Sequence, residues 1–254
     1  MNWLARTAAL AALAAAFVAT CADAHGIVLQ VVYDGYGHPG YDPKEANLNP
    51  PGVVGWKVEA GMNGSPVVND AFAKPDIVCG KDATPAQNSI TVKAGTKITV
   101  QRSKWPDTHH GVVMDYLASC NGPCAKAEAT SLKFVKLDEK GMIEASKVPG
   151  KAGLWATDEM LAAGSAWTIT LPKGIKDGEY VLRHEIIALH GAEKDNFTEA
   201  YPQCINLIVT GGDPSAPAEL PGIPATAFYT DIPKTTNIYA DLKSYTLPGP
   251  PVWS

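Results

Sequence analysis

The sequence predicts an all-β protein, an immunoglobulin- or fibronectin III-like β-sandwich with long surface loops and an extended C-terminal segment that wraps over it. Short apolar or alternating runs are separated by turns rich in Gly, Pro, Asn and Asp, and no internal repeat is present. Many short strands with irregular connections are typical of a sandwich. The clearest strand candidates are residues 27–33, 89–102, 111–118, 132–137, 166–171, 179–190 and 204–209.

Two long segments lack a strand pattern. Residues 33–51 are rich in glycine, proline and tyrosine, which predicts a surface loop. Beyond Val209 the chain is again rich in Pro and Gly, yet it carries aromatic residues that would form exposed apolar surface in a free tail. We therefore expect the tail to cover the sandwich with these side chains: Phe228, Tyr229, Tyr239, Tyr245 and Trp253.

The first 24 residues have the pattern of a secretory signal peptide. Arg6 precedes an Ala/Leu/Phe/Val run, and Ala22-Asp23-Ala24 places small residues at the cleavage positions. We expect a secreted, extracellular protein whose mature chain, residues 25–254, is one domain. In a eukaryotic host the sequons at Asn63 and Asn196 are then candidate N-glycosylation sites.

Net charge and the distribution of apolar runs argue against two classes of partner. The chain carries a formal charge of -5, and removal of the signal peptide takes away one Arg and one Asp, so this charge is unchanged. Nucleic acid is excluded as an expected partner because phosphate binding needs a basic field. A membrane is not expected either, because no second long apolar run follows the signal peptide; we expect a monomer.

The cysteines fit an exported protein. Cys21 lies in the signal peptide, which leaves an even number in the mature chain and predicts two disulfides. Three connectivities are possible. Cys120 and Cys124 are the natural local pair, because Asn-Gly-Pro between them is typical of a tight turn, and Cys79 with Cys204 follows by elimination. A zinc site with Cys120, Cys124 and histidines is the competing interpretation.

His25 becomes the first residue of the mature chain if cleavage follows Ala24. A terminal histidine combines an α-amine and an imidazole on one residue. Two such nitrogen donors suit copper above the other available divalent metals. A histidine at this position can also occur by chance, so the hypothesis depends on partner ligands elsewhere in the chain.

Two groups of histidines are candidate partners. His109 and His110 precede a strand, whose neighbouring residues point to opposite faces, so only one of them easily serves a given metal and spacing does not choose between them. His184 and His190 share parity and would project from one face of an unbulged strand. His184 is equally consistent with a core histidine, whereas His190 lies at the strand end and is the better candidate.

Five segments, in this order, resemble the fungal lytic polysaccharide monooxygenases of Auxiliary Activity family 9. They follow the His-Gly mature terminus and are PDIVC at 75–79, WPDTHHGVVMDYLASCNGPC at 105–124, YVLRHEIIALH at 180–190, YPQCINL at 201–207, and the tail from 237 to 251. The resemblance spans the mature chain. No separate carbohydrate-binding module is expected, because no Cys-rich terminal segment is present.

The resemblance implies a copper ion held by a histidine brace. By position in the matching motifs, the ligands would be the amine and ring of His25, a ring nitrogen of His109, and the hydroxyl of Tyr201 at an axial position, which leaves His110 a structural role. His190 would hydrogen-bond oxygen species at the metal, Glu199 falls where the family usually has glutamine, and Tyr239 would stack on sugar rings of the substrate.

The implied activity is oxidative cleavage of β-1,4-glucan chains such as cellulose at C1 or C4, with O2 or H2O2 and an external electron donor. Two rivals are weighed against it. A non-catalytic copper-binding protein would use the same brace, and an endoglucanase would need a carboxylate pair. No such pair is evident, because Glu185 is better explained as a strand residue beside Arg183.

Glu199 predicts an altered dependence of activity on pH and slower turnover than in relatives with glutamine. A carboxylate accepts a hydrogen bond where an amide would donate one, so a donating role here needs a protonated carboxyl or a changed geometry. Rates of wild type and Glu199→Gln measured across pH would test the idea. Superimposable profiles would contradict it.

Overall fold

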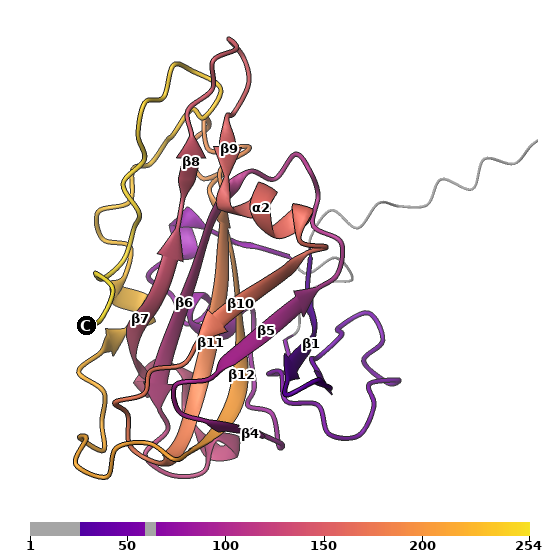
Figure 1. Ribbon diagram of the computed structural model, residues 1–254. Helices are drawn as coiled ribbons and strands as arrows, with labels where there is room; N and C mark the ends of the chain where they lie inside the picture. Colours follow the sequence, from indigo (N-terminus) through magenta and orange to yellow (C-terminus); the bar gives the residue numbers. More distant parts are fainter. Residues whose placement is uncertain (1–25, 59–64) are drawn as a thin grey trace, which may run out of the picture.

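Two β-sheets pack face to face in the computed structural model, which describes residues 26–58 and 65–254, and the predicted all-β sandwich is confirmed (Figure 1). The smaller sheet has the order β10-β5-β1-β2, all antiparallel. Its strands are β1 (Val28–Tyr33), β2 (Tyr36–Pro39), β5 (Lys97–Arg102) and β10 (Ala166–Thr170).

The larger sheet has the order β13-β7-β6-β11-β12-β3, and β4 pairs in parallel with β12. Its strands are β3 (Val67–Val68), β4 (Ile90–Lys93), β6 (Gly111–Ser119), β7 (Lys133–Lys140), β11 (Gly178–Ala188), β12 (Glu199–Thr210) and β13 (Ile223–Pro224). A separate hairpin and short helices complete the fold: β8 (Met142–Glu144), β9 (Leu154–Trp155), α1 (Asp76–Cys79), α2 (Ala156–Ala162), and 3-10 turns η1 (Asn69–Ala71), η2 (Cys124–Lys126), η3 (Ala129–Ser131) and η4 (Ala225–Ala227).

Two sequence predictions about strands are wrong. Residues 89–102 are not one strand: a turn at Gly95, whose φ is +77°, sends β4 to the large sheet and β5 to the small one. Residues 33–51 are not wholly a loop, because Asp34 and Gly35 form a turn and β2 pairs back onto β1. Apolar alternation alone does not show where a chain changes sheet.

Both faces of the large sheet are buried, which explains why β6 is nearly all apolar. The polar side chains of β11 that are buried with it, Arg183, His184 and Glu185, each have a charged or polar partner. Towards the small sheet, one cluster of buried side chains fills the sandwich: Val31, Ile98, Val100, Leu117, Leu182 and Leu207. On the outer face a second cluster lies between the sheet and the segments that cover it: Phe72, Ile77, Tyr116, Val181, Phe228 and Tyr229.

The C-terminal tail supplies much of the outer cover, as the sequence predicts. Phe228 and Tyr229 are buried, and the Trp253 amide donates to the Lys136 carbonyl of β7 at 2.8 Å. In Figure 1 the yellow tail follows β7 and reaches the β8–β9 hairpin. Tyr239, Tyr245 and Trp253 are half-buried.

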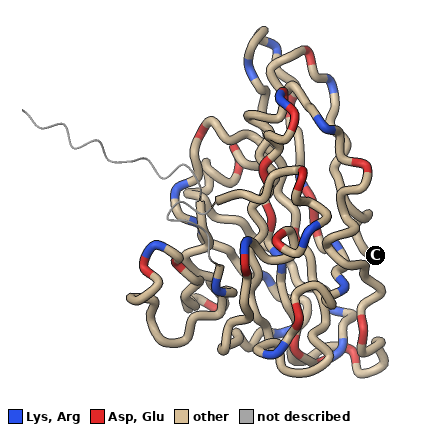
Figure 2. The backbone as a smooth tube through the Cα atoms, turned by 180° about the vertical axis from the view of Figure 1, so that it is seen from behind, with Lys and Arg blue, Asp and Glu red and all other residues tan. Residues whose placement is uncertain are grey.

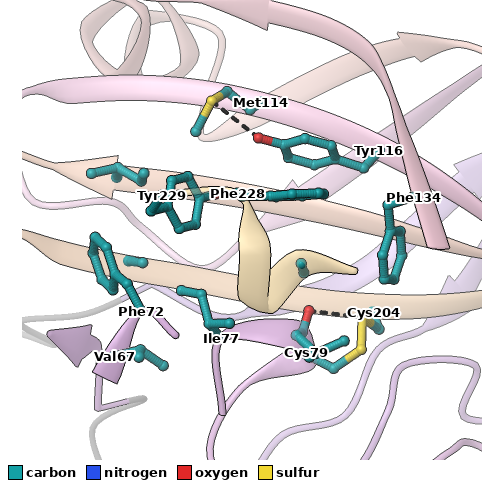
Figure 3. Packing of buried hydrophobic residues seen from close by; sticks show 14 of the residues in the cluster. Val67, Phe72, Ile77, Cys79, Met114, Tyr116, Phe134, Cys204, Phe228 and Tyr229 are labelled. Atoms are coloured by element: carbon teal, nitrogen blue, oxygen red, sulfur yellow. Dashed lines mark hydrogen bonds between the residues drawn. A yellow bond between two sulfur atoms is a disulfide. The ribbon is translucent and has the colours of Figure 1, made fainter. Parts of the chain in front are cut away.

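A disulfide, drawn in Figure 3, holds α1 against the outer face of the large sheet. The buried Arg183–Glu185 ion pair beside it does the same. The structure contains the Cys79–Cys204 bond from α1 to β12, and also the local Cys120–Cys124 bond. Arg183 of β11 donates to the carbonyls of Val78 and Ile77 at 2.7 Å and pairs with Glu185 at 2.6 Å. Tyr229 of the tail donates to the same Glu185 carboxylate, so sheet, helix and tail share one network.

Charge is spread over the surface in both signs. Figure 2 shows Lys and Arg interspersed with Asp and Glu along the coloured part of the tube, with no long run of one sign. Among the described residues, none of the helices has the length and apolar composition needed to cross a membrane.

Loss of the long disulfide should destabilise the protein more than loss of the short one. The Cys79–Cys204 loop has a sequence separation of 125 and the Cys120–Cys124 loop one of 4. On the loop-entropy model, C79A/C204A should lower the free energy of unfolding by about 4 to 5 kcal/mol and C120A/C124A by about 2 kcal/mol. Guanidinium unfolding of both double variants measures this, and equal losses would contradict it.

Candidate metal centre

Three strands of the large sheet end at the same place. Gly111 at the start of β6 pairs with Ala188 at the end of β11, which pairs in turn with Glu199 at the start of β12. Gly111 is required here, because a Cβ on it would lie 2.0 Å from the Ile187 carbonyl oxygen. The register therefore gathers the residues just outside these ends: His109 before β6 and His190 after β11.

The side chains of His109 and His190 meet at this end of the sheet. Their rings are stacked, with centroids 3.8 Å apart and an interplanar angle of 24°. The His109 Nδ1 lies 3.1 Å from the Thr108 hydroxyl, a contact that orients the ring. The Trp105 indole packs edge-on against His109 and donates to its carbonyl oxygen at 2.9 Å.

Glu199 and Tyr201 of β12 complete the group. The Tyr201 hydroxyl donates to Oε2 of Glu199 at 2.6 Å, and the same oxygen lies 3.8 Å from Nε2 of His190. Ligand atoms of His109, His190 and Glu199 all lie within 4.8 Å of one another. The side chains of His190 and Glu199 are 24% and 17% exposed, so the group opens to solvent.

Tyr201 is held as a neutral phenol. It is buried against Trp105, with ring centroids 5.1 Å apart. Burial raises the pKa of its hydroxyl far above the usual range, and the negative charge of Glu199 adds to this increase. Its proton therefore stays on oxygen and is donated in the hydrogen bond to Glu199.

Three buried or half-buried side chains that the sequence did not single out hold the backbone that follows His25. Arg102 donates to the Gly26 carbonyl, the Ser103 hydroxyl accepts from the Ile27 amide at 3.0 Å, and Gln203 accepts from the Val28 amide at 2.7 Å. Trp105 packs so tightly on Gly26 that a Cβ there would lie 2.9 Å from the indole. Trp105 and Gln203 lie in segments 105–124 and 201–207, which carry the family resemblance. Arg102 could have been noticed only as a single arginine at the end of an apolar strand. His25 itself lies outside the described residues.

Arg102 brings a positive charge beneath the site. It is fully buried and stacks over Trp105, with Cζ 5.4 Å from the ring centroid. Burial lowers its pKa to about 9, although Tyr201 and Asp115 act in the opposite direction, so the guanidinium is protonated at neutral pH. The guanidinium charge interacts with the Tyr201 hydroxyl and with Asp115.

The other two candidate histidines lie in separate networks. His110 pairs with Asp158 of α2 at 2.9 Å. His184 is buried and pairs with Asp115 of β6 at 2.7 Å, so its partner is a carboxylate rather than the backbone. Because β11 ends at Ala188, the strand parity expected of His184 and His190 does not apply to His190.

The remaining predicted site residues are dispersed. Tyr239 lies half-buried in the tail, where burial and then the Glu193 carboxylate raise its pKa. Asn196 lies on the loop before Glu199, and its side-chain oxygen accepts from the Asp70 amide at 2.9 Å. Asn63 lies outside the described residues.

The donor set fits copper. Imidazole nitrogens, a phenol and a carboxylate converge on one partly exposed place, and imidazole with oxygen donors suits Cu(II). The hydrogen bonds that fix His109 and Tyr201 are of the kind that orient ligands before a metal binds.

Comparison with known proteins identifies the group of proteins that shares these features. Residues 25–246 match the model of Auxiliary Activity family 9 (formerly GH61). The chain is 46% identical over 250 residues to the AA9 family lytic polysaccharide monooxygenase F of Malbranchea cinnamomea, covering 98% of this chain and 97% of that protein.

Solved structures of lytic polysaccharide monooxygenases have the same fold as this chain. The extended catalytic domain of H. jecorina LPMO9A superposes with a TM-score of 0.81 at 39% identity, covering 91% of each chain. A cellulose-active polysaccharide monooxygenase from M. thermophila has a TM-score of 0.70 at 26% identity, covering 90% of this chain and 99% of that one.

Substitutions of His109 and His110 should have different effects, the first on metal affinity and the second on stability. His109→Ala removes a ligand and should lower the affinity for Cu(II) by more than about 100-fold, since loss of groups that merely support a ligand already costs about 10- to 100-fold. His110→Gln, the matched control, should keep the affinity within about threefold and lower the melting temperature through loss of the Asp158 pair. Calorimetric copper titration and thermal unfolding measure both. Equal loss of affinity in the two variants would refute the assignment.

Proposed function

The chain belongs to Auxiliary Activity family 9, whose members are copper-dependent lytic polysaccharide monooxygenases, and on this premise we propose that it cleaves the β-1,4-glucan chains of cellulose by oxidation at C1, C4 or both. The observation that carries the proposal is the convergence of His109, His190, Glu199 and Tyr201 at one partly exposed end of the large sheet. The co-substrate would be O2 or H2O2, with an external reductant.

In this proposal the amine and ring of His25, a ring nitrogen of His109 and the hydroxyl of Tyr201 hold one copper ion. When bound, copper supplies one-electron redox chemistry towards O2 or H2O2. The Thr108 hydroxyl and the Trp105 indole fix the orientation of the His109 ring. Arg102, Ser103 and Gln203 fix the backbone that follows His25, so the nitrogen donors would be presented by a rigid frame.

His190 and Glu199 would hold and pass protons beside the metal. Nε2 of His190 lies 3.8 Å from Oε2 of Glu199, close enough for both groups to contact one small co-substrate. Oε2 already accepts a hydrogen bond from the Tyr201 hydroxyl, so Glu199 acts here as an acceptor. A glutamine, which the family usually has at this position, would keep an oxygen acceptor for Tyr201 and add an amide N–H donor. Glu199 lacks that donor when it is ionised.

The substrate proposal has two supports. The M. thermophila structure that superposes on this chain is that of a cellulose-active enzyme. The partial exposure of His190 and Glu199 suits a polymer that is held on a surface. We also propose that residues 1–24 are removed as a signal peptide, that the protein is secreted, and that residues 25–254 act as one monomeric copper monooxygenase domain.

The structure argues against the alternative that the protein is an endoglucanase, because Glu185 does not fit the role of a catalytic carboxylate. Glu185 is fully buried, pairs with Arg183 at 2.6 Å and accepts from Tyr229, so it is not accessible to a sugar. A general acid must reach the glycosidic oxygen, and this carboxylate faces the core below the tail.

Product analysis tests the proposal. Processed protein with His25 as its first residue, loaded with copper and incubated with amorphous cellulose, ascorbate and air, should release oligosaccharides with aldonic acid or 4-ketosugar masses. These products should disappear without reductant and in His109→Ala. Only reducing ends would indicate a hydrolase, and tight copper binding with no oxidised product on a panel of glucans would indicate a binding protein.

A further inference from the structure

The loop of residues 191–198 connects the two halves of the metal centre. It begins after His190 and ends before Glu199, both of which belong to the centre. The loop folds back on itself, because a Cβ on Gly191 would lie 3.4 Å from Cβ and 3.6 Å from Cδ1 of Phe197. Phe197 is therefore placed beside the residue that follows His190.

Phe197 is exposed where most aromatic side chains are not. Its side chain is 51% exposed, and among the described aromatic residues only Tyr36, at 73%, is also in the exposed class. The aromatic residues that belong to the metal centre itself, Trp105 and Tyr201, are buried. An exposed aromatic ring beside a reactive group is a common feature of ligand-contact surfaces.

Lys194 gives this ring a polar neighbour. Its ammonium nitrogen lies 5.7 Å from the centroid of the Phe197 ring. The ammonium lies over one face of the ring, so an apolar aromatic surface and a hydrogen-bond donor lie together. A pyranose ring offers the matching pair, an apolar C–H face and equatorial hydroxyl groups at its edge.

The loop is fixed before any ligand binds. Asn196 accepts from the Asp70 amide at 2.9 Å, and the Thr236 amide of the tail donates to the Ala192 carbonyl at 2.6 Å. Ala192 and Thr198 are buried. A contact surface held in this way loses little conformational entropy on binding, which favours affinity.

The same loop approaches the tail residue that the family resemblance assigns to the substrate. The Thr236 amide, three residues before Tyr239, donates to the Ala192 carbonyl of the loop at 2.6 Å. Loop 191–198 therefore joins the metal centre at both of its ends and contacts the tail segment that leads to Tyr239.

We propose that Phe197, with Lys194 beside it, is a polysaccharide-contact residue whose ring stacks on a glucose unit of the bound β-glucan next to the metal centre. The proposal rests on the proposed function and extends it to a specific residue. The contact contributes to binding of the chain and takes no part in the copper chemistry.

Binding without turnover tests this directly. Copper-loaded protein without reductant, produced in a host that adds no N-glycans so that Asn196 is bare, is titrated with amorphous cellulose and with xyloglucan. Phe197→Ala should weaken binding by about 5- to 10-fold, a typical size for one aromatic contact, and Phe197→Trp should restore it. Tyr36→Ala is the matched control, because Tyr36 pairs with Tyr33 at the far end of β1, about 17 Å along the strand from Val28. It should stay within about twofold of wild type.

The outcomes separate the two proposals. Copper affinity and melting temperature of Phe197→Ala should equal those of wild type, which excludes a folding defect. If wild type binds and oxidises glucan while Phe197→Ala binds equally well, the contact proposal is overturned and the proposed function stands. If wild type neither binds nor oxidises any glucan tested, both are overturned.

Discussion

The pairing register of β6, β11 and β12 is the constraint on which the metal centre depends. Gly111, Ala188 and Glu199 lie side by side, and the groups of the centre are the residues just beyond or beside these three. A slip of one residue in a strand reverses which side chains face each sheet surface. Such a slip would part His109 from His190 and bury charges such as Arg183 and Glu185 among the wrong neighbours. The close approach at Gly111 and the apolar clusters on both faces of the sheet hold this register.

The electrostatic design places charge in two layers. The Tyr201 phenol interacts with both the buried guanidinium of Arg102 and the carboxylate of Glu199, to which it donates a hydrogen bond. Farther inside, Asp115 binds both His184 and the Trp167 indole, which links the large sheet to the small one. Polar groups buried in this way need several partners each, and this requirement limits the conformations open to the site.

The sandwich and the tail that covers it were predictable because each leaves a local signature. Alternation marks the strands, and aromatic residues in a Pro/Gly-rich tail mark the cover. The candidate site residues came from the family resemblance, because spacing alone does not choose between His109 and His110. The division of residues 89–102 between two sheets was not predictable, since both halves are equally apolar and only the turn at Gly95 separates them. The support for the backbone after His25 was missed because Arg102, Ser103 and Gln203 meet Gly26 to Val28 only through tertiary structure.

The tail has a consequence for the order of events during synthesis. The Arg183–Glu185 pair lies under Tyr229, and Cys79 waits for Cys204, a partner 125 residues later in the chain. A chain that folds as it emerges therefore holds an uncovered ion pair and an unpaired thiol until its last quarter arrives. During that interval the outer face of the large sheet is an apolar surface open to other chains. On the proposed secretory route, chaperones and thiol oxidases would meet a nascent chain whose last-made segment closes its core.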